Sequence, residues 1–247
     1  GIWLLSLFFK ILFSFISKYL KKNLHPFWLG IKKHPTLYKF FHAITPKNEV
    51  DHYATVILVA ITVFAFLGFI ILVGMQFQAF WITTIDLPVY LLIKSFHTPP
   101  LKAFLIICTQ FANIITIGLL FLSCIIWFFL SKNKFSVFYL ISIVFLSALI
   151  AFITTLSVPF HTAFPTSSSY TRYLTIATAF YSFVYFYTRY HFNFLTNILR
   201  TLLFVVLGFS GLGIIALGDS TITSVFASYC CGLFIATVHY LIYRKLN

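Results

Sequence analysis

Residues 198–243 read ILRTLLFVVLGFSGLGIIAL, then GDST, then ITSVFASYCCGLFIATVHYLIY, so that two apolar runs flank four small or polar residues. A hydrocarbon core about 30 Å thick is crossed by roughly 20 apolar residues in α-helical conformation. Each run is long enough to cross it, and Gly-Asp-Ser-Thr is typical of a turn. This stretch therefore predicts two consecutive transmembrane helices joined by a short turn.

The same pattern recurs along most of the chain. Four further candidate spans lie at about 54–75, 101–130, 135–157 and 173–189, which brings the predicted number of transmembrane helices to six. The chain is 61% hydrophobic and only 9% charged, whereas soluble domains are about 25% charged. We therefore predict an all-α, polytopic membrane protein with a six-helix bundle.

The first part of the chain differs from the bundle. Residues 1–24 place serine and lysine at steps of three and four, which predicts an amphipathic helix lying on the membrane surface. A seventh span, or the end of a preceding membrane domain, is the alternative for this segment. Residues 25–53 form a basic connector interrupted by three prolines, and residues 54–247 form the membrane domain.

The segment 81–100 is too interrupted to cross a membrane. Asp86 stands before Leu87 and Pro88, an order typical of a helix start. We expect a short helix on the outer surface of the membrane here.

Charge placement predicts the orientation of the chain. With six spans, fourteen of the seventeen Lys and Arg residues fall on one side of the membrane, and basic loops face the cytoplasm. The fourteen are Lys10, Lys18, Lys21, Lys22, Lys32, Lys33, Lys39, Lys47, Lys132, Lys134, Arg189, Arg200, Arg244 and Lys245. Both ends of the 54–247 domain are then cytoplasmic, and the hydroxyl-rich stretch FPTSSSYTR (164–172) faces outward. The net charge of +13 needs no nucleic-acid partner, since no nucleic-acid-binding module is visible.

Several stretches together resemble the type 2 phosphatidic acid phosphatase (PAP2) superfamily of six-helix membrane phosphatases, in particular its bacterial branch, which is sometimes joined to a DedA-type membrane domain. They are KKHPTLYKFFHAITPKN (32–48), TTIDLPVYLLIKSFHTPPLKAFLIICTQFANI (83–114), FPTSSS (164–169), TIATAFYSF (175–183) and LGFSGLGIIALG (207–218). The resemblance implies a PAP2-like bundle in the bacterial cytoplasmic (inner) membrane. It implies membrane lipids as partners, a DedA-type neighbour or another membrane protein as a further partner, and no metal or other cofactor.

The resemblance also implies three catalytic motifs, and the first two are degenerate here. In K-x6-R-P, Pro159 fits, but Ala151 and Val158 stand for Lys and Arg. In P-S-G-H, Pro165 fits, but Thr166, Ser167 and Ser168 follow it. A second alignment, anchored on TIATAFY, puts Arg172 and Tyr173 at the Gly and His positions. Either alignment lacks the histidine that protonates the leaving oxygen.

The third motif, S-R-x5-H-x3-D, is also degenerate. Ser210 fits, but Gly211, Leu217 and Thr221 stand for Arg, the nucleophilic His and Asp. An alternative anchor on ASYCCG moves the last two positions to Ser220 and Ser224. The family mechanism needs an imidazole that attacks phosphorus, so we expect the chain not to be an enzyme.

Eight residues are the candidates for a vestigial lipid-phosphate site on the outer face: His161, Pro165, Thr166, Ser167, Ser168, Arg172, Ser210 and Asp219. A helix start offers amide donors to an anion, and arginine binds phosphate bidentately. Most have an ordinary alternative: an N-cap and solvated loop for the hydroxyls from Thr166 on, snorkelling for Arg172, a surface histidine for His161 and a capping or turn residue for Asp219.

Three functions remain open at this point. The first is a catalytically inactive PAP2-fold protein that binds a lipid phosphate or headgroup, or serves as a subunit of a lipid-handling or envelope complex. The second is a lipid phosphatase that uses other residues, such as His161, Arg172 and Asp219. The third is a purely structural membrane-complex subunit whose pocket is closed.

Overall fold

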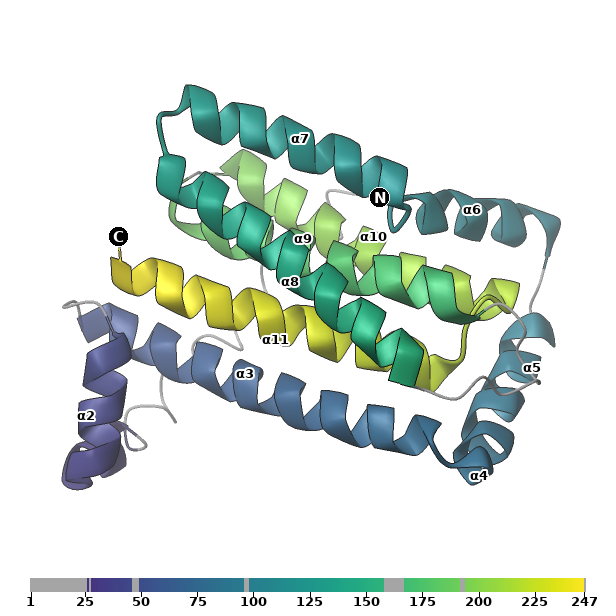
Figure 1. Ribbon diagram of the computed structural model, residues 1–247, viewed down its shortest axis with the longest axis horizontal. Helices are drawn as coiled ribbons and strands as arrows, with labels where there is room; N and C mark the ends of the chain where they lie inside the picture. The colour runs from purple at the N-terminus through teal and green to yellow at the C-terminus, as the bar shows by residue number, and fades with distance from the viewer. Residues whose placement is uncertain are drawn as a thin grey trace.

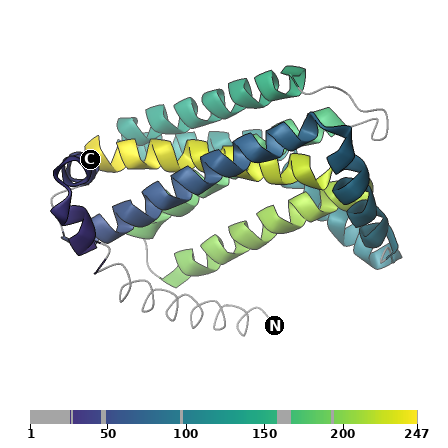
Figure 2. The ribbon, with the colours of Figure 1, turned by 90° about the horizontal axis from the view of Figure 1, so that it is seen from below.

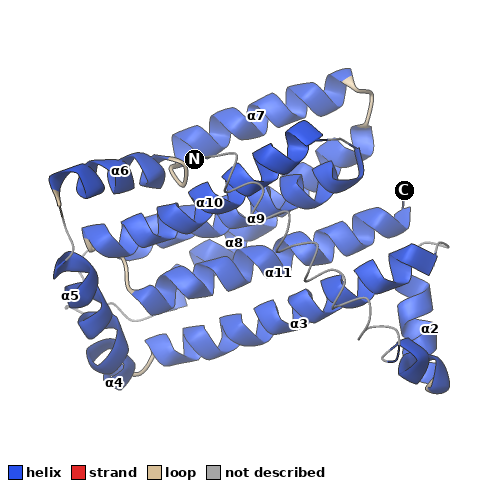
Figure 3. Ribbon diagram, turned by 180° about the vertical axis from the view of Figure 1, so that it is seen from behind, coloured by secondary structure: helices blue, strands red, loops and turns tan. Residues whose placement is uncertain are grey.

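The computed structural model describes residues 26, 28–45, 49–95, 98–157, 167–191 and 194–246. All regular elements in these ranges are helices (Figure 3). They are α2 (Pro35–Ile44), α3 (Glu49–Gln76), α4 (Ala79–Trp81), the π-helical turn η1 (Ile82–Asp86), α5 (Leu87–Ser95), α6 (Pro99–Gln110), α7 (Ile114–Leu130), α8 (Lys134–Ser157), α9 (Ser167–His191), α10 (Phe194–Leu217) and α11 (Ile222–Leu246). The predicted surface helix at 1–24 lies outside the described residues.

The predicted spans correspond in order to α3, α6 with α7, α8, α9, α10 and α11. Three described helical segments are long and apolar enough to cross a membrane: His52–Gln76, Lys134–Thr154 and Ile222–Leu246. A fourth span results if α6 and α7 count as one bent pair. The protein is therefore an all-helical membrane bundle, and its large exposed apolar side chains, such as Phe64 and Leu130, suit a lipid environment.

The single long helix expected at 101–130 is broken. α6 ends at Gln110, α7 begins at Ile114, and the two axes differ by 46°. Asn113 caps α7 by accepting a hydrogen bond from the Ile115 amide at 3.3 Å. Around the break, the hydroxyls of Ser210 and Tyr181 donate to the carbonyls of Cys108 at 2.6 Å and Phe111 at 2.7 Å. Side chains of α10 and α9 thus supply hydrogen bonds to the broken segment.

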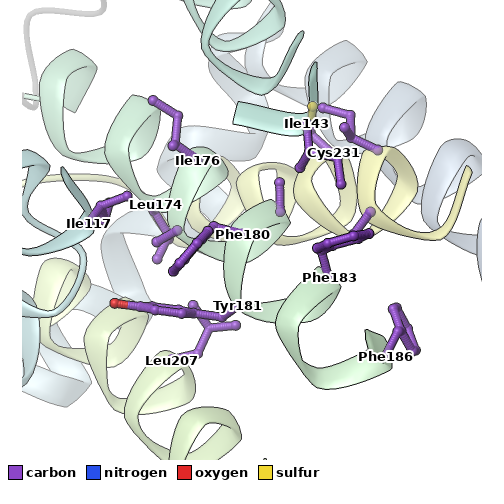
Figure 4. Close-up of a cluster of buried hydrophobic side chains, with 14 of the residues drawn as sticks. Ile117, Ile143, Leu174, Ile176, Phe180, Tyr181, Phe183, Phe186, Leu207 and Cys231 are labelled. Carbon is purple, nitrogen blue, oxygen red and sulfur yellow. The ribbon is translucent and has the colours of Figure 1, made fainter. Parts of the chain in front are cut away.

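The helices pack in layers around α9 and α11. α11 packs against α3 on one side and α9 on the other, and α9 also packs against α8 and α10. Figures 1 and 2 show α3, α8, α9, α10 and α11 running side by side, with α4 and α5 crossing one end of the bundle. The apolar core of the bundle is centred on α9, where Leu174, Ala177 and Phe183 are fully buried. Figure 4 shows Phe180, Tyr181 and Leu207 converging between helices.

Polar contacts fix the direction of the central helices. Asn133 donates to the Tyr187 hydroxyl at 3.3 Å, and Ser136 is hydrogen-bonded to the Tyr243 hydroxyl at 3.1 Å. The start of α8 therefore lies beside the ends of α9 and α11, and we call this the proximal end of the bundle. α9 and α11 both begin at the opposite, distal end, where α3, α8 and α10 end and where α4 and α5 lie (Figure 1).

Candidate functional site at the distal end

The starts of α9 and α11 both lie at the distal end. The first peptide groups of a helix carry unpaired N–H donors and the positive end of the helix dipole. Because α9 and α11 run in the same direction and pack together, their positive ends face the same side of the bundle. An anion would be stabilised there, whereas a cation would be repelled.

The start of α11 is built from hydroxyl side chains. Thr221 caps the helix, since its Oγ1 accepts from the Ser224 amide at 3.2 Å and donates to Ser224 Oγ at 2.7 Å. The hydroxyl oxygens of Thr221 and Thr223 are 3.2 Å apart. The sequence Thr-Ile-Thr-Ser therefore makes a compact group of hydroxyls around the first turn of α11.

Asp86 enters this group from a distant part of the chain. Its Oδ1 accepts from the Thr223 amide at 3.0 Å, and its Oδ2 accepts from the Thr223 hydroxyl at 2.9 Å. The side chain is only 2% exposed. Loss of water around the carboxylate raises its pKa, and the hydrogen bonds from Thr223 oppose this rise.

The predicted helix start at Asp86 is confirmed, because α5 begins at Leu87, but the carboxylate does not cap that helix. Asp86 is the last residue of the π-helical turn η1, and its carboxylate binds the first turn of α11 instead of α5. The sequence contained a signal for this role, because Asp86 is one of only four acidic residues in the chain. An isolated acid in an apolar chain needs a donor partner if it is buried.

The turn between α10 and α11 is tight. Gly218 adopts a φ of +79°, a conformation that glycine takes readily, and a Cβ there would lie 3.2 Å from the Tyr90 hydroxyl. α5 therefore sits against this turn through Tyr90. Asp219 is half-buried, and partial loss of hydration raises the pKa of its carboxyl.

Ser220 is the unusual side chain of the turn. It is 1% exposed, and its Oγ has no hydrogen-bond partner among the described residues. Leaving a buried hydroxyl unpaired costs about 1–3 kcal/mol. Ser220 immediately precedes the N-cap Thr221, so an unused donor lies at the positive end of α11.

The eight predicted site residues are distributed as follows. Ser167 and Ser168 are the first two residues of α9, and Arg172 lies one turn further along that helix, half-buried. Asp219 belongs to the turn before α11. Ser210 lies within α10, where its hydroxyl binds the Cys108 carbonyl of α6. His161, Pro165 and Thr166 lie outside the described residues, and no group of three or more metal-binding side chains is found among the described ones.

Comparison with known proteins identifies the fold. No protein-family model and no curated protein matches the sequence. The structure is similar to the crystal structure of a transmembrane PAP2-type phosphatidylglycerolphosphate phosphatase from Bacillus subtilis, with a TM-score of 0.65 and 15% sequence identity. The match covers 75% of this chain and 97% of the other. The chain therefore has a PAP2-like membrane fold.

Proposed function

We propose that this protein is a non-catalytic PAP2-fold membrane protein that binds the phosphate headgroup of a membrane lipid at the distal end of its bundle. The observation that carries the proposal is the common direction of α9 and α11, which places two helix starts and the half-buried Arg172 at one end. Helix starts favour anions. Arginine adds a planar set of donors that matches phosphate.

The loss of catalysis is proposed from the sequence. The positions that correspond to the family histidines hold Ser168 or Tyr173 and Leu217 or Ser220. A hydroxyl or an alkyl group cannot attack phosphorus as an imidazole does, and a serine would need a base beside it. The hydroxyls keep donors near a phosphate but supply no proton acceptor of suitable pKa.

The basic residues that the sequence assigns to the proximal side favour a cytoplasmic position for that end under the positive-inside rule. The proposed site then faces the outer side of a bacterial inner membrane, at the level of the outer headgroups. Phosphate monoester lipids are the preferred class of ligand, because a dianionic headgroup gains more from helix starts and arginine than a zwitterionic one.

Binding to short-chain phosphatidic acid tests the proposal on purified protein in nanodiscs. We expect Arg172→Ala to weaken binding about tenfold or more, since a charge-assisted hydrogen bond contributes about 1.5–3 kcal/mol. Arg172→Lys should restore only part of the affinity, because it lacks the bidentate geometry. Lys134→Ala, which removes an exposed proximal charge, is the matched control and should bind like wild type.

Phosphate release from the same lipid is measured in parallel. Release that disappears in His161→Ala or Arg172→Ala would identify an active phosphatase with displaced residues and overturn the proposal. Absence of both binding and release would also overturn it.

A closed structural subunit is the second candidate, and one contact favours it. The Asp86 carboxylate already occupies the Thr223 donors at the start of α11. If this contact never opens, the protein acts through its helix faces. A membrane protein that copurifies stoichiometrically in the absence of any lipid binding would then support this second function.

A further inference from the structure

We propose that Asp86 is a built-in anion that closes a phosphate site at the start of α11, and that a lipid phosphate opens the site by displacing it. The inference rests on the proposed function and adds a regulatory element to it. The moving part is the segment 79–95, comprising α4, η1 and α5, which we call the strap.

The first step concerns the donors that Asp86 engages. The Thr223 amide and the Thr223 hydroxyl both donate to this one carboxylate, at 3.0 Å and 2.9 Å. Two donors that converge on two oxygens of one anionic group also match two oxygens of a phosphate monoester. The start of α11 therefore presents an anion-binding arrangement, and in this structure a side chain of the same molecule fills it.

The second step is independent of Asp86. Ser220 is 1% exposed, and no described residue accepts a hydrogen bond from its Oγ. A carboxylate has two oxygens, and both are engaged by Thr223. On this proposal, the third oxygen of a phosphate accepts from the Ser220 hydroxyl, which belongs to the turn three residues before Thr223. The site thus has more donor capacity than its present occupant uses.

The third step concerns how firmly the strap is held. Asp86 is the only fully buried side chain among the described side chains of the strap, and none of the nine residues of α5 is buried. Phe80, Leu91 and Leu92 are largely exposed. Besides Asp86, the strap meets the bundle through Tyr90 against Gly218 and through the half-buried Ile93, which packs against the hydrophobic core. A short segment with few fully buried side chains can detach from the protein locally without unfolding the bundle.

The fourth step is the charge balance. Asp86 and a phosphate compete for the same donors, and a bound carboxylate repels a second anion in a desolvated site. The fraction of molecules with the strap detached then limits the apparent affinity for phosphate. Removal of the Asp86 charge, with its side-chain shape kept, should raise that fraction.

The test uses Asp86→Asn in the full chain, with short-chain phosphatidic acid and inorganic phosphate as separate probes. We expect Asp86→Asn to bind phosphatidic acid about tenfold more tightly than wild type. Ser95→Ala is the matched control on the strap, because Ser95 is exposed and its hydroxyl donates to the Leu92 carbonyl of its own helix, so this variant should bind like wild type. Adding Ser220→Ala to Asp86→Asn should reverse part of the gain.

Hydrogen exchange on the wild-type protein provides a measurement that does not depend on the folding of a variant. Saturating phosphatidic acid should increase exchange in residues 79–95 and decrease it in residues 220–225. Binding of inorganic phosphate alone with the same changes would identify free phosphate as the ligand, whereas an effect restricted to the lipid would identify the headgroup in its membrane.

The failure of this inference differs from the failure of the proposed function. If wild type binds phosphatidic acid through Arg172 but Asp86→Asn binds equally well and exchange in the strap is unchanged, the displacement mechanism is wrong and the lipid site stands. If neither protein binds either probe, both proposals are wrong.

Discussion

Asp86 is a buried carboxylate at the distal end of the bundle. Asp86 has lost nearly all contact with solvent, and its two oxygens depend on the amide and hydroxyl of Thr223. Removing the Thr223 hydroxyl would leave a buried carboxylate oxygen with fewer hydrogen bonds, which is destabilising. Asp86 therefore ties a segment that is otherwise exposed to the start of α11.

The raised pKa of Asp86 predicts a pH-dependent stability. Burial raises the pKa above the ordinary value of 3.8, so the folded state binds the proton more tightly than the unfolded chain. Stability is then highest when Asp86 is protonated, and it falls as the pH rises above 3.8 through the raised pKa. Thermal unfolding in detergent between about pH 4 and about pH 7 should show this fall, and Asp86→Asn should remove a large part of it.

Asp219 provides the comparison for this measurement. Its pKa is raised by the same cause, but the side chain is only half-buried. Asp219→Asn should therefore flatten the pH dependence less than Asp86→Asn. If thermal stability changes with pH as steeply in Asp86→Asn as in wild type, the pH effect does not come from the Asp86 carboxylate.

The candidate site is only partly predictable from residue types. Arg172, Ser167 and Ser168 stand out because a run of hydroxyls ends on one of the four arginines of the chain, and they do belong to the start of α9. From the sequence, Asp86 is predicted only as the start of a local helix, because its hydrogen-bond partner Thr223 lies 137 residues away. Ser220 enters only through an alternative alignment, since nothing in a sequence reveals whether a hydroxyl finds a partner.

The interface between α9 and α11 depends on a close approach of their backbones. A Cβ on Gly232 would lie 2.6 Å from Thr178 Cβ and 2.8 Å from the Thr175 carbonyl oxygen. These distances are shorter than ordinary van der Waals contact, so the helices would have to separate. Small residues at such positions allow transmembrane helices to pack tightly.

Gly232→Ala is therefore expected to destabilise the bundle by about 1–3 kcal/mol, the usual cost of overpacking. Gly118→Ala is the matched control, because it lies inside α7 and a Cβ at this position would have nothing within 4 Å. That control should be neutral or stabilising by roughly 0.5–1 kcal/mol, as alanine favours a helix. Unfolding in SDS–detergent mixtures measures the free energy of unfolding of both variants. Equal stability of the two variants would contradict the close α9–α11 contact.

The break between α6 and α7 shows what periodicity alone misses. The run 101–130 is apolar throughout except for a few polar residues, so its composition predicts one long helix. The break is accompanied by hydrogen bonds from Ser210 and Tyr181, and these residues follow 70 or more positions later in the chain. Composition determines that the segment enters the membrane, whereas tertiary contacts determine its bend.

At the scale of the whole molecule, the order and approximate position of the helices were predictable. The length of an apolar run determines whether its helix can cross the bilayer, and the placement of charges determines its orientation. Both properties are local and can be taken from the sequence. The layered arrangement, in which α11 lies between α3 and α9, was accessible only through the resemblance to the PAP2 superfamily. The fold similarity to a PAP2-type phosphatase at 15% identity supports that resemblance without extending it to catalysis.

Orientation in the membrane is the last prediction, and a pair of matched serines tests it. Ser95 lies at the distal end and Ser131 at the proximal end, both are exposed, and both hydroxyls donate to a carbonyl of the preceding turn. The four cysteines, Cys108, Cys124, Cys230 and Cys231, are unpaired and would be replaced by alanine.

In intact cells, a membrane-impermeant maleimide should label Ser95→Cys, because the distal end carries few basic residues and is therefore expected to face outward. Ser131→Cys should react only after permeabilisation if the proximal end follows the general preference of basic loops for the cytoplasm. The reverse pattern would place the Asp86 and Arg172 end in the cytoplasm, where the proposed ligand would have to be a lipid of the inner leaflet.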